Sequence, residues 1–171
     1  MESYLRRLVY LLMCVGALLV FTACGASAPP PPANFSAEIT IARGGSKQYA
    51  RLEAERPGLL QLVFASPETL GGMEISIKGD AASLEYDGMR AEIPAAFLPR
   101  EGAAPLLNQV LLQLAQPLQK SERKSLRHLR GGGWERRGAA GGVDYIARLS
   151  EEGALQNLRA AGLEIVISYE T

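Results

Sequence analysis

Few residues in this chain could do chemistry, because its 171 residues include only two cysteines and a single histidine. His128 lies among basic residues. Catalysis would need a carboxylate and a nucleophile beside it, and no spacing brings Asp144 or Ser150 there. Two cysteines and one histidine are also too few for a closed zinc site. The sequence therefore predicts no enzyme, no catalytic residue, no metal site and no cofactor.

The first 23 residues have the pattern of a secretory signal peptide. Arg6 and Arg7 precede an apolar run, Leu8–Ala23, of about 16 residues. A helix that spans a bilayer needs about 20 residues, so the run favours a signal peptide over a membrane anchor. Cys14 lies inside the run and would be removed with the signal.

Cys24 follows the run directly, after Thr22 and Ala23. The segment from Val20 to Gly25 resembles the lipobox of bacterial lipoproteins, with Phe21 where leucine is usual. The resemblance implies that Cys24 is acylated, by palmitate or a similar chain, and becomes the first mature residue. Its acyl chains would anchor the protein in membrane lipid on the extracytoplasmic side, at the cell membrane or at an outer membrane where two exist. The alternative is an ordinary signal peptide with an incidental cysteine.

Residues 25–33 contain four consecutive prolines, Pro29–Pro32. Such a run favours the extended polyproline II conformation, with a rise of about 3.1 Å per residue. We therefore expect residues 24–33 to be a lipidated cysteine followed by a short, semi-rigid tether that lifts one domain, residues 34–171, off the bilayer.

Within that domain apolar and polar residues mostly alternate, which is typical of half-buried strands. Six strands are expected near residues 35–41, 47–55, 59–65, 73–77, 83–86 and 89–93. About four more are expected near residues 134–139, 143–149, 154–160 and 163–169. Short turns such as Asp87-Gly88 separate them, so consecutive strands should form an antiparallel meander.

One segment between the two sets of strands, an insert at about residues 103–130, changes to the helical period. Pro105 suits the first turn of a helix, whereas Pro117 predicts a kink or a stop near Gln113–Gln116. Residues 121–130 are expected to form a second helix or a loop. The apolar stripe covers an arc of about 140° and comprises Leu106, Leu107, Val110, Leu111, Leu114 and Leu118.

These elements predict an α+β fold in which a curled antiparallel sheet of about ten strands forms a half-open barrel. The helical insert covers its concave face. With the lipobox, this order resembles the LolA/LolB-like superfamily, and in size it also resembles the spore-germination lipoproteins. The resemblance implies a cavity for an acyl chain beneath the insert. Leu107, Val110, Leu111, Leu114 and Leu118 would then line that cavity, or else form part of the core.

The sharpest charge feature is a basic patch in and after the insert. The whole chain balances 18 basic against 18 acidic residues, which argues against a nucleic-acid partner. The patch could contact anionic lipid headgroups or an acidic protein, with Trp134 either anchoring that interface or packing in the core. Its members are Lys120, Arg123, Lys124, Arg127, Arg130 and Trp134.

Two functions follow from these patterns. The first is an anchored lipoprotein that binds an apolar ligand, such as a lipid or an acyl chain, in the concave sheet. The second is a non-enzymatic protein that docks or regulates a partner of the cell envelope, such as a cell-wall hydrolase, through the basic insert. A cavity of several hundred Å³ would favour the first.

Overall fold

The computed structural model describes residues 28–169, apart from the side chains of Lys120, Ser121 and Arg123. The predicted signal peptide and Cys24 lie outside the described residues. Within them, six strands precede the helix: β1 (Phe35–Arg43), β2 (Ser46–Arg56), β3 (Leu59–Ser66), β4 (Glu74–Lys78), β5 (Ala81–Tyr86) and β6 (Met89–Pro94). Five follow it: β7 (Leu126–His128), β8 (Trp134–Ala140), β9 (Val143–Leu149), β10 (Leu155–Ala160) and β11 (Leu163–Tyr169).

In the described residues, one α-helix and three short 3₁₀ turns accompany the strands. The α-helix is α2 (Ala103–Leu114), and the turns are η2 (Glu68–Leu70), η3 (Ala95–Phe97) and η4 (Lys120–Ser125). In the described part of the chain, no helix is long and apolar enough to cross a membrane.

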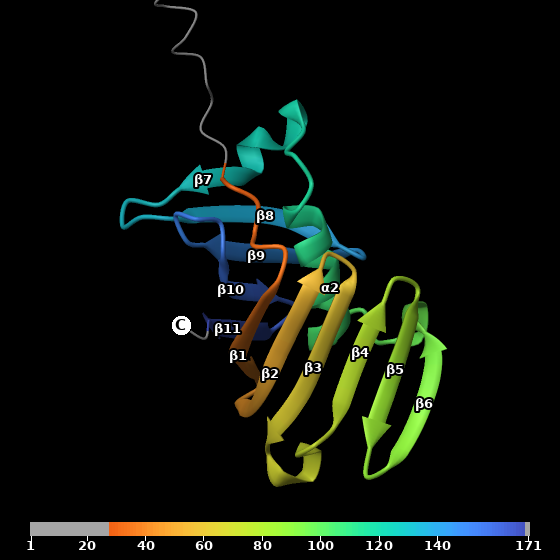
Figure 1. Cartoon of the computed structure of the whole chain (residues 1–171). Helices are drawn as coiled ribbons and strands as arrows, with labels where there is room; N and C mark the ends of the chain where they lie inside the picture. Colours follow the sequence, from red (N-terminus) through yellow and green to blue (C-terminus); the bar gives the residue numbers. More distant parts are fainter. Residues whose placement is uncertain (1–27, 170–171) are drawn as a thin grey trace, which may run out of the picture.

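All eleven strands form one antiparallel sheet in the order β6-β5-β4-β3-β2-β1-β11-β10-β9-β8-β7. The first and last strands meet in its middle, where Ile39 of β1 pairs with Ile167 of β11. The sheet curls, and α2 lies in the angle between the half formed by β1–β6 and the half formed by β7–β11 (Figure 1). The predicted fold class, a half-open barrel with a helical insert, is confirmed.

The insert differs in detail from the expectation. The helix ends at Leu114, as Pro117 predicted, because proline cannot continue a helical ladder. Beyond it, residues 126–128 form the edge strand β7, which pairs with β8 from Leu126 opposite Arg136 to His128 opposite Trp134. Three residues are too few to show a period of two, so this strand could not be read from the pattern.

The core lies between the sheet and the inner face of α2. Leu106, Leu107 and Val110 are almost fully buried there, as are Leu62 of β3 and Leu158 of β10. Burying a leucine or isoleucine side chain contributes roughly 1.5–3 kcal/mol, so this contact holds the two halves of the sheet together.

Polar contacts fix the end of α2 against β8 and β9. The buried guanidinium of Arg136 donates to the backbone carbonyl of Gln113 at 3.0 Å, where the negative end of the helix dipole favours a cation. The side chain of Gln113 donates to the carbonyl of Ala139 at 2.8 Å and accepts from the hydroxyl of Tyr145 at 3.0 Å. These bonds fix the C-terminal end of α2 relative to β8 and β9.

Tyr169 joins three strands in the middle of the sheet, β1, β10 and β11. Its hydroxyl donates to the carbonyl of Leu155 at 3.0 Å, and its ring packs against Phe35 with 5.2 Å between centroids. Burial raises the pKa of Tyr169 to about 12, and burial likewise raises the pKa of Tyr145. Both groups therefore resist ionisation while the chain is folded.

The raised pKa of Tyr169 predicts a loss of stability in alkali. Unfolded tyrosine titrates near pH 10, so the stabilisation is complete below pH 10 and is lost as the pH rises towards 12. We expect Tyr169→Phe to lower the free energy of unfolding by about 1 kcal/mol at neutral pH and to flatten its decline above pH 10. Urea unfolding across this range, with the exposed Tyr49→Phe as control, would measure both; an unchanged alkaline decline would contradict the assignment.

Candidate functional site

The concave face of the sheet is only partly covered. Next to α2, Ile77 of β4 and Ala82 of β5 are buried. Further along the same inner face, Ile75 and Leu84 are half-buried, and the exposed fraction rises to 69% at Met89 of β6. The register places these residues in neighbouring rows, with Ile75 opposite Leu84 and Leu84 opposite Ala91. An apolar strip therefore remains open on the inner face of β4–β6.

Two exposed aromatic residues lie at this strip. Tyr86, opposite Met89, is 40% exposed, and its hydroxyl donates to the carbonyl of Thr69 at 3.1 Å. Phe97, in the turn η3 after β6, is 76% exposed. We call the inner-face residues Ile75, Leu84, Tyr86, Met89, Ala91 and Ile93 the open strip.

The proline segment, defined as residues 28–33, covers another part of the molecule. A Cβ at Gly153, in the turn between β9 and β10, would overlap the carbonyl of Pro29 and lie 2.9 Å from that of Pro30. Further along, Pro31 and Pro32 border a hollow of only about 20 Å³ shared with Asn108 and Leu111 of α2. The expected tether thus lies against the domain between the β9–β10 turn and the helix.

The residues predicted to line a ligand cavity lie in the core. Leu107, Val110, Leu111 and Leu114 are 0–6% exposed and pack with the inner strand residues. Leu118 follows the end of α2 and is half-buried. Since these side chains are in close contact with the sheet, the open strip is the apolar surface available to a ligand in this conformation.

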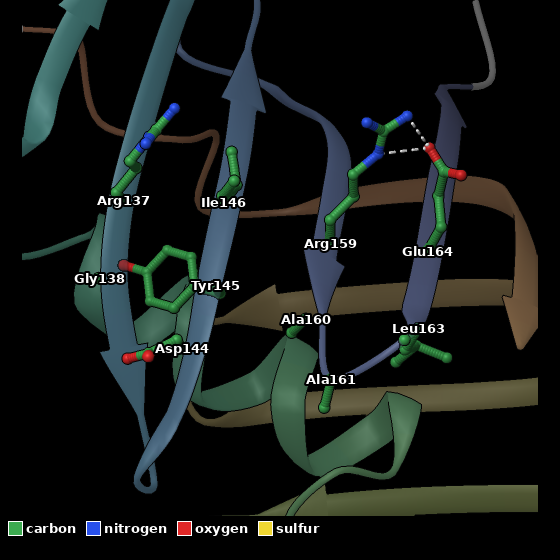
Figure 2. Close-up of a pocket in the computed structure, with 11 residues that line it drawn as sticks. Arg137, Gly138, Asp144, Tyr145, Ile146, Arg159, Ala160, Ala161, Leu163 and Glu164 are labelled. Atoms are coloured by element: carbon green, nitrogen blue, oxygen red, sulfur yellow. Dashed lines mark hydrogen bonds and ion pairs between the residues drawn. The ribbon is translucent and has the colours of Figure 1, made fainter.

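Two larger hollows lie on the outer face of the sheet. One, of about 820 Å³, crosses β8–β11 (Figure 2). Arg137, Ile146, Arg159 and Glu164 form a row across its floor, and Arg159 Nη2 lies 2.7 Å from the carboxylate of Glu164. The hollow is wide open to solvent and its charges are largely paired, so it is a poor site for an apolar molecule.

The second outer hollow, of about 830 Å³, lies over β2–β6. Glu53, Gln61, Ser76, Ser83 and Glu92 form a polar row across it, one residue from each strand. The outer and inner faces of the same strands therefore differ sharply in polarity, as the period of two requires.

One residue of the predicted basic patch, Arg127, contacts a buried carboxylate. Glu135 of β8 is 5% exposed, and its side chain lies 3.4 Å from Arg127, 3.1 Å from Arg137 and 3.8 Å from Arg148. Three guanidinium groups thus share one carboxylate, which leaves a local excess of positive charge on this outer face. The backbone of Lys120 and Arg123 belongs to η4, and Lys124 and Arg130 are exposed.

His128 and Trp134 lie together on β7 and β8. Their rings meet edge to face with 4.8 Å between centroids, and His128 Nε2 lies 3.4 Å from the carboxylate of Glu151. Trp134 packs against the core, and its indole Nε1 is buried without a hydrogen-bond partner in the described structure. Trp134 is therefore at the edge of the core, and its ring contact with His128 joins it to β7.

The other two candidates for chemistry, Asp144 and Ser150, lie at opposite ends of β9. Ser150 accepts hydrogen bonds from the backbone of Glu152 and Ala154 and so stabilises its own turn, while Asp144 borders the hollow over β8–β11. Among the described residues, no group of three or more histidine, cysteine, aspartate or glutamate side chains could hold a metal ion.

Comparison with known proteins finds solved structures of low sequence identity. No family model matches the chain, and no curated protein matches it. An uncharacterized conserved protein from Thermus thermophilus is 13% identical, with a TM-score of 0.48 over 80% of this chain and 77% of its own. A LolA superfamily protein from Nitrosomonas europaea is 12% identical, with a TM-score of 0.43 over 84% and 87%. LprF from Mycobacterium bovis is 11% identical, with a TM-score of 0.37 over 80% and 85%.

A LolA superfamily protein is thus among the solved structures that this chain is similar to, and nothing in the comparisons singles out the spore-germination subset. The open strip was not among the predicted site residues. Its alternation with polar residues was visible in the sequence, but the pattern could not show that α2 stops short of it.

The Glu135 cluster gives a prediction about stability. We expect Glu135→Gln to lower the free energy of unfolding by about 1–2 kcal/mol, less than the 3–5 of a fully buried pair, because the guanidinium groups are more than half exposed. The control is Glu92→Gln, whose ion pair with Arg90 is exposed on both sides; we expect it to change stability by less than about 0.5 kcal/mol. Equal effects in chemical denaturation would contradict a structural role for the cluster.

Proposed function

We propose that this chain is an extracytoplasmic lipoprotein, anchored through acylated Cys24, that binds an apolar ligand on the open strip. Residues 1–23 would be its signal peptide, residues 24–33 the lipidated cysteine and tether, and residues 34–171 the binding domain. The observation that carries the ligand proposal is the continuous apolar surface left open on the inner face of β4–β6.

The shape of this surface favours an acyl chain. The helix has 12 residues, a length of about 18 Å at 1.5 Å per residue. Strands about 4.8 Å apart make the eleven-stranded sheet far wider than that, so α2 covers only part of the inner face. An extended hydrocarbon chain lying along Ile75, Leu84 and Ile93 would bury the exposed faces of these side chains, at roughly 0.8 kcal/mol per methylene.

The residues at the two ends of the strip differ in polarity. The buried end of the strip meets α2 at Ile77 and Ala82, whereas the exposed end at Met89 adjoins the charged hairpin residues Asp87 and Arg90. A lipid would therefore place its hydrocarbon towards the helix and its headgroup towards the β5–β6 turn.

The ligand prediction is tested by substitutions on the strip. We expect Leu84→Gln with Met89→Gln to weaken binding of a fluorescent fatty-acid analogue by roughly tenfold or more, because amides replace apolar contacts. The assay uses residues 25–171, which lack the anchor, so that bound probe cannot be confused with the protein's own acyl chains. Val166→Gln, an exposed apolar position on the outer face, is the control, and native mass spectrometry would identify lipid that co-purifies.

Two results would contradict this proposal. Binding of the analogue could be absent from the unsubstituted chain, or the Val166 and Leu84/Met89 variants could bind it equally. In either case the open strip would be an uncovered flank of the core with no ligand of this kind.

The anchor is tested separately through its cysteine. We expect Cys24→Ala to abolish incorporation of an alkyne-labelled fatty acid by cells, because the thiol that receives the acyl chain is removed. Cys14→Ala, in the predicted signal peptide, should keep the label and provides a matched control. Label that persists in the Cys24→Ala chain would show that another residue is modified.

A further inference from the structure

We propose that the edge formed by η4, β7 and the β7–β8 turn, with exposed Lys124, Arg127 and Arg130, rests on a bilayer that contains anionic lipid. The inference depends on the proposed anchoring at Cys24 and adds to it a defined orientation. We call this surface the basic edge.

The docked proline segment brings the start of the described chain to this edge. Pro29 lies against Gly153 in the β9–β10 turn. The carboxylate of Glu151 in the same turn lies 3.4 Å from His128 of β7 and accepts a hydrogen bond from the backbone of Gly133 at 2.9 Å. The first described residues accordingly run beside β7 and in front of β8 (Figure 1).

The length of chain before this point is short. Only four residue steps separate Cys24 from Ala28, and an extended chain covers at most about 14 Å in four steps. Acyl chains inserted at Cys24 would therefore hold the basic edge close to the headgroup layer, within one to two screening lengths of about 8 Å at physiological ionic strength.

The charge of this edge suits an anionic surface. Lys124 and Arg130 are exposed and, among the described side chains, form no ion pair with a carboxylate. Arg127 shares Glu135 with two other arginines and is itself 68% exposed. Of the acidic residues nearby, Glu122 lies 3.9 Å from buried Arg136 and Glu151 contacts His128, while Glu152 remains exposed in its turn.

A bilayer fits these observations better than an acidic protein. A protein partner could contact basic residues anywhere on the surface, whereas the short link from Cys24 brings this particular edge to the membrane. Each basic residue near an anionic leaflet increases association by roughly fivefold. The three exposed side chains would therefore select one orientation among those that the anchor permits.

The experiment measures this orientation with the lipidated chain reconstituted into vesicles. A cysteine introduced by Gly131→Cys, in the β7–β8 turn where a side chain meets nothing within 4 Å, carries a fluorescent donor, and labelled lipid carries the acceptor. Its counterpart is Glu85→Cys on exposed β5. Each would be the one free thiol, since Cys14 leaves with the predicted signal and Cys24 carries the acyl group.

We expect strong energy transfer from the Gly131→Cys label and weak transfer from the Glu85→Cys label in vesicles of phosphatidylcholine with phosphatidylglycerol. Replacing Lys124, Arg127 and Arg130 by glutamine should lower the oriented population by roughly fivefold per residue. The matched variant replaces Arg56, Lys78 and Arg90, exposed bases of the β2–β6 half, and should leave it unchanged. High salt should act like the first variant.

Three results would overturn the inference, and they are distinguishable. Equal transfer from both labels, unaffected by lipid charge, would show an anchored chain without fixed orientation. A chain that lacks the acyl mass and does not float with vesicles would show that the proposed anchoring has failed as well. Unchanged transfer in the Lys124/Arg127/Arg130 variant, together with lost crosslinking to an acidic envelope protein, would assign the basic edge to a protein partner.

Discussion

The whole architecture depends on one helix that is too short for its sheet. Eleven strands present a continuous concave face. In the described chain, the α-helix that covers this face is α2, which has 12 residues. The helix lies where the two halves meet, so the inner residues of β3 and β10 are buried beneath it. Surface further from the helix must be covered by something else or remain in contact with water.

In this molecule, one part of the inner face beyond α2 is covered by another segment, and another part remains exposed to water. On the side of β9 and β10, the proline segment lies against the turn at Gly153, a position with φ of +87° where a side chain would collide with it. Proline suits this role because its fixed φ lowers the conformational entropy that is lost on docking. On the side of β5 and β6 no segment of the described chain plays this part, and the inner face ends in half-buried and exposed apolar residues.

Arg136 links the position of α2 to that of the charged surface on β8. Its guanidinium is bonded to the last turn of α2 and lies near Glu122 of η4, so the position of the helix and that of η4 depend on the same side chain. One residue earlier in β8, Glu135 points to the other face and gathers three arginines. A single strand thus fixes the helix on one face and organises the basic surface on the other.

Local rules were sufficient for most of the fold. Period-two alternation, the apolar run at residues 59–65 and the turn signals between segments located ten of the eleven strands. Pro117 located the end of the helix. These signals all depend on neighbours in the sequence. Strand β7 was missed, since three residues form a strand only where β8 pairs with them through backbone hydrogen bonds. The docking of the proline segment and the openness of the strip were also missed. Both depend on contacts between residues distant in the chain and on the length of α2 relative to the sheet.

The two proposals, taken together, constrain how a ligand would reach the protein. The basic edge and the first described residues lie at the β7 side of the molecule, and the open strip lies on β4–β6 at the other edge of the sheet (Figure 1). With the β7 side on the bilayer, the strip would face away from the membrane that holds the anchor. A hydrocarbon chain could not slide directly from that membrane onto the strip without crossing water, at a cost of roughly 0.8 kcal/mol per exposed methylene. A second protein that shields the chain would remove this cost, so the arrangement suits exchange of a ligand with a partner in the extracytoplasmic space better than extraction from the protein's own bilayer.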